Sequence, residues 1–263
     1  MAHIISLSKL LNNGDPMQYF FDCVETIPDG IGWAHYSPLH LTWLAAIALT
    51  VLLGCLLYRR LDPDGRRKMR YILAGLTVGN EIFKMWLLMS QGNYYEEYLP
   101  LHLCSINIFV VLWHALRPNE NVGAFLYTVC VPGAIAALLF PTWNELPLLC
   151  GMHIHSFTVH AELVLYPLML VAGGEVHPRL RQIPKILGLL VLSGIPAIIV
   201  NHFCGTNFMF LRYAEPGNPL LVFEQLFGNH LIGIPILISI ILVVLYTPWV
   251  IADRRKAKKT TKV

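Results

Sequence analysis

The sequence predicts an all-α polytopic membrane protein with seven transmembrane helices, its N-terminus outside and its C-terminus cytoplasmic. Hydrophobic residues make up 56% of the 263 residues and charged residues only 13%, which is about half the charged share of a soluble domain. Seven apolar segments each approach the roughly 20 residues that a spanning helix needs. The basic residues gather in alternate loops, and this pattern gives the orientation.

Each predicted span is a run of apolar residues between polar or turn-forming ones. The runs cover 39–58, 70–90, 99–116, 122–141, 153–172, 186–203 and 229–251. We recognise no internal repeat, low-complexity tract or long linker that would divide them. We therefore expect an extracytoplasmic segment over 1–37, a single seven-helix domain over 38–252 and a basic cytoplasmic tail over 253–263.

The loop charges orient the chain. Sixteen of the 19 Lys and Arg residues fall on one side of the predicted spans: Arg59, Arg60, Arg66, Arg67, Lys68, Arg70, Arg117, Arg179, Arg181, Lys185, Arg254, Arg255, Lys256, Lys258, Lys259 and Lys262. Lys9 and Arg212 fall on the other side. Basic loops stay in the cytoplasm, so we expect a multi-pass protein of the cell membrane. The tail is short and has no aromatic residue, which argues against a nucleic-acid partner.

The second span carries Asn80, Glu81 and Lys84 near its middle. Glu81 and Lys84 are three residues apart, so they can form an ion pair on one helix face. Two interpretations stay open. The pair either pins this helix against its neighbours, or Glu81 orients a histidine.

The third span opens with the polar stretch Leu99-Pro100-Leu101-His102-Leu103-Cys104-Ser105-Ile106-Asn107. Polar groups in a spanning helix are costly unless they are paired, line water or do chemistry. With a helix beginning near Pro100, Cys104 and Asn107 share a face. His102 is then expected on another face, toward the outer interface.

The fifth span begins with three histidines within eight residues. Helical spacing divides its polar residues into one stripe of His153, Ser156 and His160 and a second of His155, Thr158 and Glu162. At about 1.5 Å rise per residue, Cys104 and His160 each lie roughly 6–10 Å below their helix starts. A thiol needs an activating base, and an imidazole at similar depth can supply one.

Other polar residues lie at the outer ends of the spans. Asn201 and Asn207 flank the end of the sixth span, and Arg212 is close enough to that end to meet a lipid phosphate. The six cysteines follow no metal-binding or disulfide spacing. Cys23, Cys150 and Cys204 fall near predicted outer loops, so a disulfide among them stays open.

Four motifs carry a family resemblance. They are NEIFKMWLL (80–88), LPLHLCSINIF (99–109), HIHSFTVHAELVLYPL (153–168) and GTNFMFL (205–211). Together they resemble the YwaF-like bacterial integral membrane proteins and their eukaryotic relative, transmembrane protein 164. That resemblance implies a cysteine-dependent acyltransferase that moves fatty acyl chains between phospholipids. It places the cysteine on Cys104 and the histidine, followed seven residues later by Pro167, on His160.

Three functions remain after these observations. The first is acyl transfer or acyl hydrolysis on membrane phospholipids, without metal or cofactor, by Cys104 as nucleophile and His160 as base, oriented by Glu81 or Asn107. The second is a zinc hydrolase using His153, His155 and His160 with Glu81 or Glu162. The third is a lipid or small-molecule carrier. The residues expected to contact substrate are His102, His153, His155, Asn201, Asn207 and Arg212.

Overall fold

The computed structural model describes residues 17–215 and 217–260, and every regular element in this part is helical. Seven helical segments are long and apolar enough to cross a membrane, which confirms the predicted spans. Their helices are α2 (Pro38–Arg60), α3 (Pro63–Ser90), α4 (Leu103–Leu116), α5 with α6 (Glu120–Phe125 and Val131–Leu139), α7 (Gly151–Ala172), α8 (Ile183–Cys204) and α10 (Gly233–Thr260). The first 16 residues of the predicted segment 1–37, including Lys9, and tail residues 261–263 lie outside the described part.

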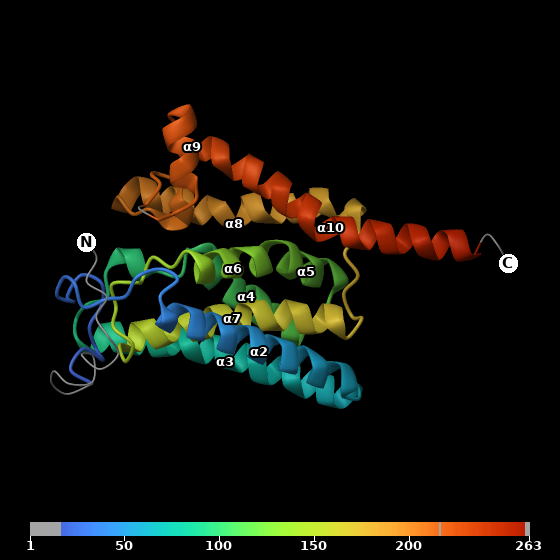
Figure 1. The fold of residues 1–263 in the computed structure, drawn as a ribbon, viewed down its shortest axis with the longest axis horizontal. Helices are drawn as coiled ribbons and strands as arrows, with labels where there is room; N and C mark the ends of the chain where they lie inside the picture. The colour runs from blue at the N-terminus through green and yellow to red at the C-terminus, as the bar shows by residue number, and fades with distance from the viewer. Residues whose placement is uncertain (1–16, 216, 261–263) are drawn as a thin grey trace.

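Helix α7 is the centre of the fold. Helices α2, α3 and α6 all pack against it, and α4 packs against α3. Figure 1 shows α8 and α10 together along one side of this bundle, with the C-terminal end of α10 extending beyond it. Because α7 is covered on most sides, its polar side chains can be held away from lipid by the surrounding helices.

Proline and a capping residue begin both of the first two helices. Pro38 follows Ser37, whose side chain accepts a hydrogen bond from the backbone N–H of His40. Pro63 follows Asp62, which accepts one from the N–H of Gly65. These are ordinary helix-start signals. The second helix therefore begins seven residues before the predicted 70, because its first two turns are basic and do not count toward an apolar run.

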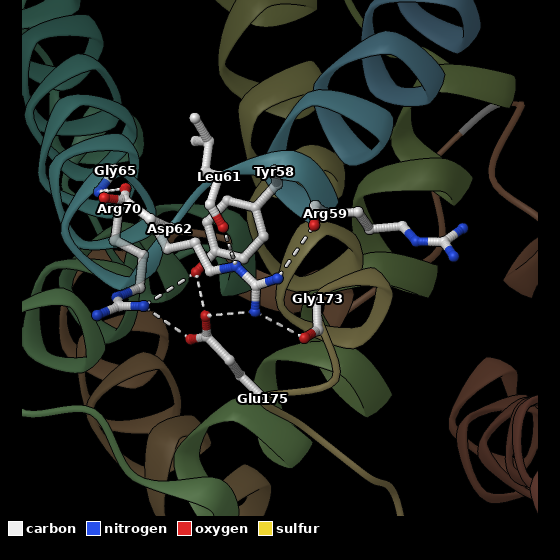
Figure 2. Close-up of polar contacts among 9 residues, drawn as sticks. Tyr58, Arg59, Leu61, Asp62, Gly65, Arg70, Gly173 and Glu175 are labelled. Carbon is white, nitrogen blue, oxygen red and sulfur yellow. Dashed lines mark hydrogen bonds and ion pairs between the residues drawn. The ribbon is translucent and has the colours of Figure 1, made fainter.

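An ion-pair network, which we call the Glu175 clamp, ties the end of α2 and the start of α3 to the turn after α7 (Figure 2). The Glu175 carboxylate accepts hydrogen bonds from Arg70 and from the Tyr58 hydroxyl, both at 2.7 Å. Arg66 lies 3.8 Å from the same carboxylate and donates to the Gly173 carbonyl at 2.8 Å. Arg66 and Arg70, two of the basic residues on which the predicted orientation rests, thus also connect α3 to the turn after α7.

Several short elements are not indicated by the apolar runs, and three of them change the predicted outline. The 3₁₀ turn η1 (Glu96–Tyr98) precedes α4, which begins only at Leu103. The π-helical segment η2 (Leu126–Cys130) joins α5 to α6. Helix α9 (Leu220–Phe227) is an additional short helix before α10. Such elements leave no long apolar run in a sequence, so counting hydrophobic residues does not detect them.

The N-terminal segment folds over the beginning of α7. The Gly151 N–H donates to the Phe20 carbonyl at 2.9 Å, and the Cys150 thiol donates to the Asp22 carbonyl at 3.3 Å. Cys23, Cys150 and Cys204 are free thiols, which answers the question of a disulfide among them. Burial raises the pKa of the Cys23 and Cys150 thiols above the ordinary value, so both are poorly reactive.

Candidate functional site

A cavity of about 290 Å³ lies between α3, α4, α7 and the connection from α6 to α7. Its lining includes a thiol, three imidazoles and an ion pair: Cys104, His102, His155, His160, Glu81 and Lys84. Each of these residues stood out in the sequence on one of three separate predicted spans. The fold therefore brings the LPLHLC motif and the histidines of the fifth span to one site.

The first turn of α4 positions Cys104. His102 is the N-cap residue and has extended backbone angles, φ −66° and ψ 150°. The expectation that His102 points away from Cys104 is wrong, because both line the cavity. Helical spacing does not apply to a residue that precedes the helix. The His102 Nδ1 accepts a hydrogen bond from the Met209 N–H at 3.4 Å, and its ring lies edge-on to Phe208.

The imidazole of His160 is held on two sides. Its Nδ1 lies 2.6 Å from the Ser156 carbonyl oxygen. A carbonyl can only accept, so Nδ1 carries the proton and Nε2 is left with its lone pair. The ring also stacks on the indole of Trp143, with centroids 5.1 Å apart and planes at 13°. His160 thus has the tautomer that a general base requires.

The predicted ion pair between Glu81 and Lys84 is present in α3. The Lys84 Nζ lies 2.5 Å from the Glu81 carboxylate and 3.3 Å from the Tyr98 carbonyl oxygen. Both side chains are buried. In the described part of the chain the partner of Glu81 is this lysine and not an imidazole. The contact favours the first interpretation, a pair that holds α3 in place beside the cavity.

The histidines of α7 divide differently from the predicted stripes. His155 and His160 line the cavity together with Ser156. His153, which the helical spacing predicts to share a face with Ser156 and His160, does not line the cavity. Its Nδ1 is 3.2 Å from the Leu146 carbonyl oxygen, and its ring packs against Trp33 and Phe157.

Glu162 and Thr158 belong to a separate polar cluster between α3 and α7. The Asn80 side chain donates to Glu162 at 2.9 Å and accepts from Thr158 at 3.2 Å. Over residues 17–215 and 217–260, no three His, Cys, Asp or Glu side chains are arranged to hold a metal ion. The donor set proposed for zinc, with His153, His155 and His160, does not converge.

The remaining predicted residues, Asn107, Asn201, Asn207 and Arg212, do not line the cavity. Asn107 is fully buried inside α4. Asn201 accepts from the Phe208 N–H at 2.7 Å and donates to the Phe208 carbonyl at 3.0 Å. Asn207 accepts from the Arg212 N–H at 3.1 Å, and the Arg212 guanidinium donates to the Gly205 carbonyl. These bonds shape a turn rather than present a ligand group.

That turn brings Phe210 to the cavity wall. Met209 and Phe210 both have positive φ, 58° and 55°, a conformation that non-glycine residues adopt at some energetic cost. The hydrogen bonds of Asn201 and Asn207 offset that cost. The sequence does not connect Phe210 or the cavity residue Trp143 with the site, because no helical spacing links either residue to α4 or α7.

The comparisons with known proteins agree with the four motifs. The TMEM164 family matches residues 32–250, a range that contains the cavity-lining residues of α3, α4 and α7. No curated protein and no solved structure matches the chain. Since the match extends over most of the 263 residues, this chain belongs to the TMEM164 family.

Proposed function

We propose that this protein is a cysteine-dependent acyltransferase that moves fatty acyl chains between membrane phospholipids. The observation that carries the proposal is the shared cavity of Cys104 and His160, within a bundle of membrane-spanning length. A thiol and an imidazole with a free Nε2 are the two groups that acyl transfer through a thioester needs. Metal and soluble cofactor are not required for that chemistry.

In the first half-reaction, His160 Nε2 takes the proton of Cys104, and the sulfur adds to the ester carbonyl carbon of a phospholipid. The bond from that carbon to the glycerol oxygen then breaks. The lysophospholipid leaves with the proton from His160, and the acyl chain stays on sulfur as a thioester. In the second half-reaction, an acceptor hydroxyl gives its proton to His160 and attacks the thioester, which returns the thiol.

The start of α4 supports this chemistry. The first turn of a helix has N–H groups without an intrahelical acceptor, and the α4 start has no side-chain cap. Such groups beside Cys104 can stabilise the negative oxygen of a tetrahedral intermediate. If water replaces the acceptor lipid, the same site becomes an acyl hydrolase.

The location proposed for this reaction is the outer leaflet of the cell membrane. The cavity lies against the first turns of α7, whereas Glu175, which pairs with Arg70 of α3, follows the last turn. The cavity and the most basic loop are therefore at opposite ends of the bundle. Basic loops face the cytoplasm, and this supports an outer location for the cavity.

The test compares Cys104→Ala with Cys55→Ala in protein reconstituted into phospholipid vesicles that contain a lysophospholipid acceptor. Cys55 lies on α2, away from the cavity lining, so its variant is a matched control. We expect acyl transfer to fall by more than about 100-fold in Cys104→Ala, as for removal of a nucleophile, and to persist in Cys55→Ala.

A lipid-tailed thiol reagent gives a second readout on the wild-type protein. It should label Cys104 in preference to Cys55 and Cys130. Equal labelling, or acyl transfer that survives Cys104→Ala, contradicts the proposal. Lipid movement between leaflets that persists in a Cys104→Ala/His160→Ala double variant, without any acyl transfer, identifies the carrier instead.

A further inference from the structure

Trp143 lines the cavity but has no role in the acyl-transfer steps proposed above. It lies in the connection between α6 and α7, and its indole covers one face of the His160 imidazole at 5.1 Å and 13°. Phe157 meets the same indole edge-on at 5.5 Å and 85°. We propose that Trp143 is the positioning residue for His160, and that it stabilises the imidazolium formed when His160 takes the proton of Cys104. This inference rests on the proposed function.

The surrounding backbone holds Trp143 in place. The Trp33 N–H donates to the Asn144 carbonyl at 2.8 Å, and the Trp33 indole N–H donates to the Leu146 carbonyl at 3.0 Å. Gly32 approaches this connection so closely that a Cβ there would lie 2.3 Å from the Asn144 oxygen. The N-terminal segment thus fixes the position from which the indole contacts His160.

Two contacts restrict the imidazole in different ways. The Ser156 carbonyl sets the tautomer and anchors one edge of the ring. The stacked indole restricts rotation of the ring plane about its side-chain bond. The Nδ1 of His160 is thus occupied by the Ser156 carbonyl, whereas its Nε2 has no hydrogen bond to another described residue. A base that is already oriented loses little conformational freedom when the proton moves.

The face of an indole also interacts favourably with a cation. Its π electrons attract a positive charge placed over the ring, and the effect is largest where water is excluded. His160 is neutral before the reaction and positive after proton transfer. The indole therefore stabilises the product of that transfer more than the starting state, which is the requirement for accelerating a step.

The indole N–H provides independent support. Within the described residues the Trp143 Nε1 is buried and has no hydrogen-bond partner. A buried donor without a partner costs free energy, so its own hydrogen bonding does not explain why a tryptophan occupies this position. The aromatic face, which touches His160, does explain it.

The experiment measures the rate at which a membrane-permeant alkylating reagent modifies Cys104 at neutral pH, with the protein in lipid nanodiscs and the product read by mass spectrometry. The variants are Trp143→Leu, Trp143→Phe, His160→Ala and Trp143→Leu/His160→Ala. Trp113→Leu is the control, because Trp113 is an exposed tryptophan of α4 outside the cavity lining.

We expect Trp143→Leu to slow alkylation about tenfold, within the range of a desolvated cation–π contact. Trp143→Phe, which keeps an aromatic face, should recover part of the loss, and Trp113→Leu should match the wild type. In the His160→Ala background, Trp143→Leu should have no further effect, because a positioning residue acts only through the base.

Three results overturn the inference, and they are distinguishable. In the first, His160→Ala slows alkylation but Trp143→Leu does not. In the second, Trp143→Leu slows alkylation equally in the wild type and in His160→Ala. Either result shows that the indole does not act through His160, and the proposed function stands. If His160→Ala leaves the rate unchanged, His160 does not activate the thiol, and the proposed function fails together with the inference.

Discussion

The Glu81–Lys84 pair illustrates when single residues can be assigned from sequence. Its i to i+3 spacing lies in the middle of a regular helix, so the predicted contact forms. The same rule fails for His102, which lies one residue before α4 begins. Helical spacing is informative inside a helix and loses meaning at its ends, where capping and turn geometry decide the direction of a side chain.

The buried pair gives a prediction at this scale. Lys84→Met leaves the Glu81 carboxylate without its cation in a buried position, which should destabilise the protein by about 3–5 kcal/mol. The double variant Glu81→Leu/Lys84→Met removes both charges and should recover most of that loss. Thermal unfolding in detergent measures both. A double variant as unstable as the single one contradicts this account of the pair.

At the scale of the elements, apolar runs locate the helices, whereas the irregular segments between them build much of the site. The turn with Met209 and Phe210 and the connection with Trp143 both contribute to the cavity wall. Neither has a hydrophobic period that could be read from the sequence. Their contribution follows from long-range hydrogen bonds, such as those of Met209 with His102 and of Trp33 with Leu146, and these are visible only in three dimensions.

The Glu175 clamp allows a prediction for the joint between α2, α3 and α7. Glu175→Ala removes the acceptor of Arg70 and Tyr58, so we expect a loss of about 1–3 kcal/mol in the free energy of unfolding. Asp64→Ala is the control, because Asp64 pairs with Arg67 at 3.0 Å on the exposed surface and such pairs contribute about 0–1 kcal/mol. Equal destabilisation by the two variants argues against a structural role for the clamp.

At the scale of the whole molecule, the sequence predicts the seven spans well, because length and hydropathy are properties of each segment alone. The contacts between helices, by contrast, depend on several segments at once. The central position of α7, and the separation of α8 and α10 from α2 and α3 (Figure 1), arise from packing among distant segments. The presence of Cys104 and His160 in one cavity could therefore be expected from depth and family resemblance, whereas residue spacing within either helix carries no information about it.

The orientation of the molecule is a separate prediction. In a Cys204→Ser background, which removes an exposed thiol, a membrane-impermeant maleimide added to intact cells should label Glu96→Cys and not Arg67→Cys. Both positions are exposed; Arg67 lies near the start of α3, and Glu96 lies in η1, beyond the end of α3. Labelling of Arg67→Cys alone would reverse the orientation and place the cavity in the inner leaflet.

The central claim is that Cys104 carries the acyl group during transfer. The most direct measurement is mass spectrometry of the protein after brief exposure to a phospholipid with an isotopically labelled acyl chain and no acceptor. We predict a labelled acyl group on the Cys104 peptide that hydroxylamine removes and that Cys104→Ala lacks. Acyl transfer that proceeds with no acyl group on Cys104, or with one on another residue instead, would contradict the account.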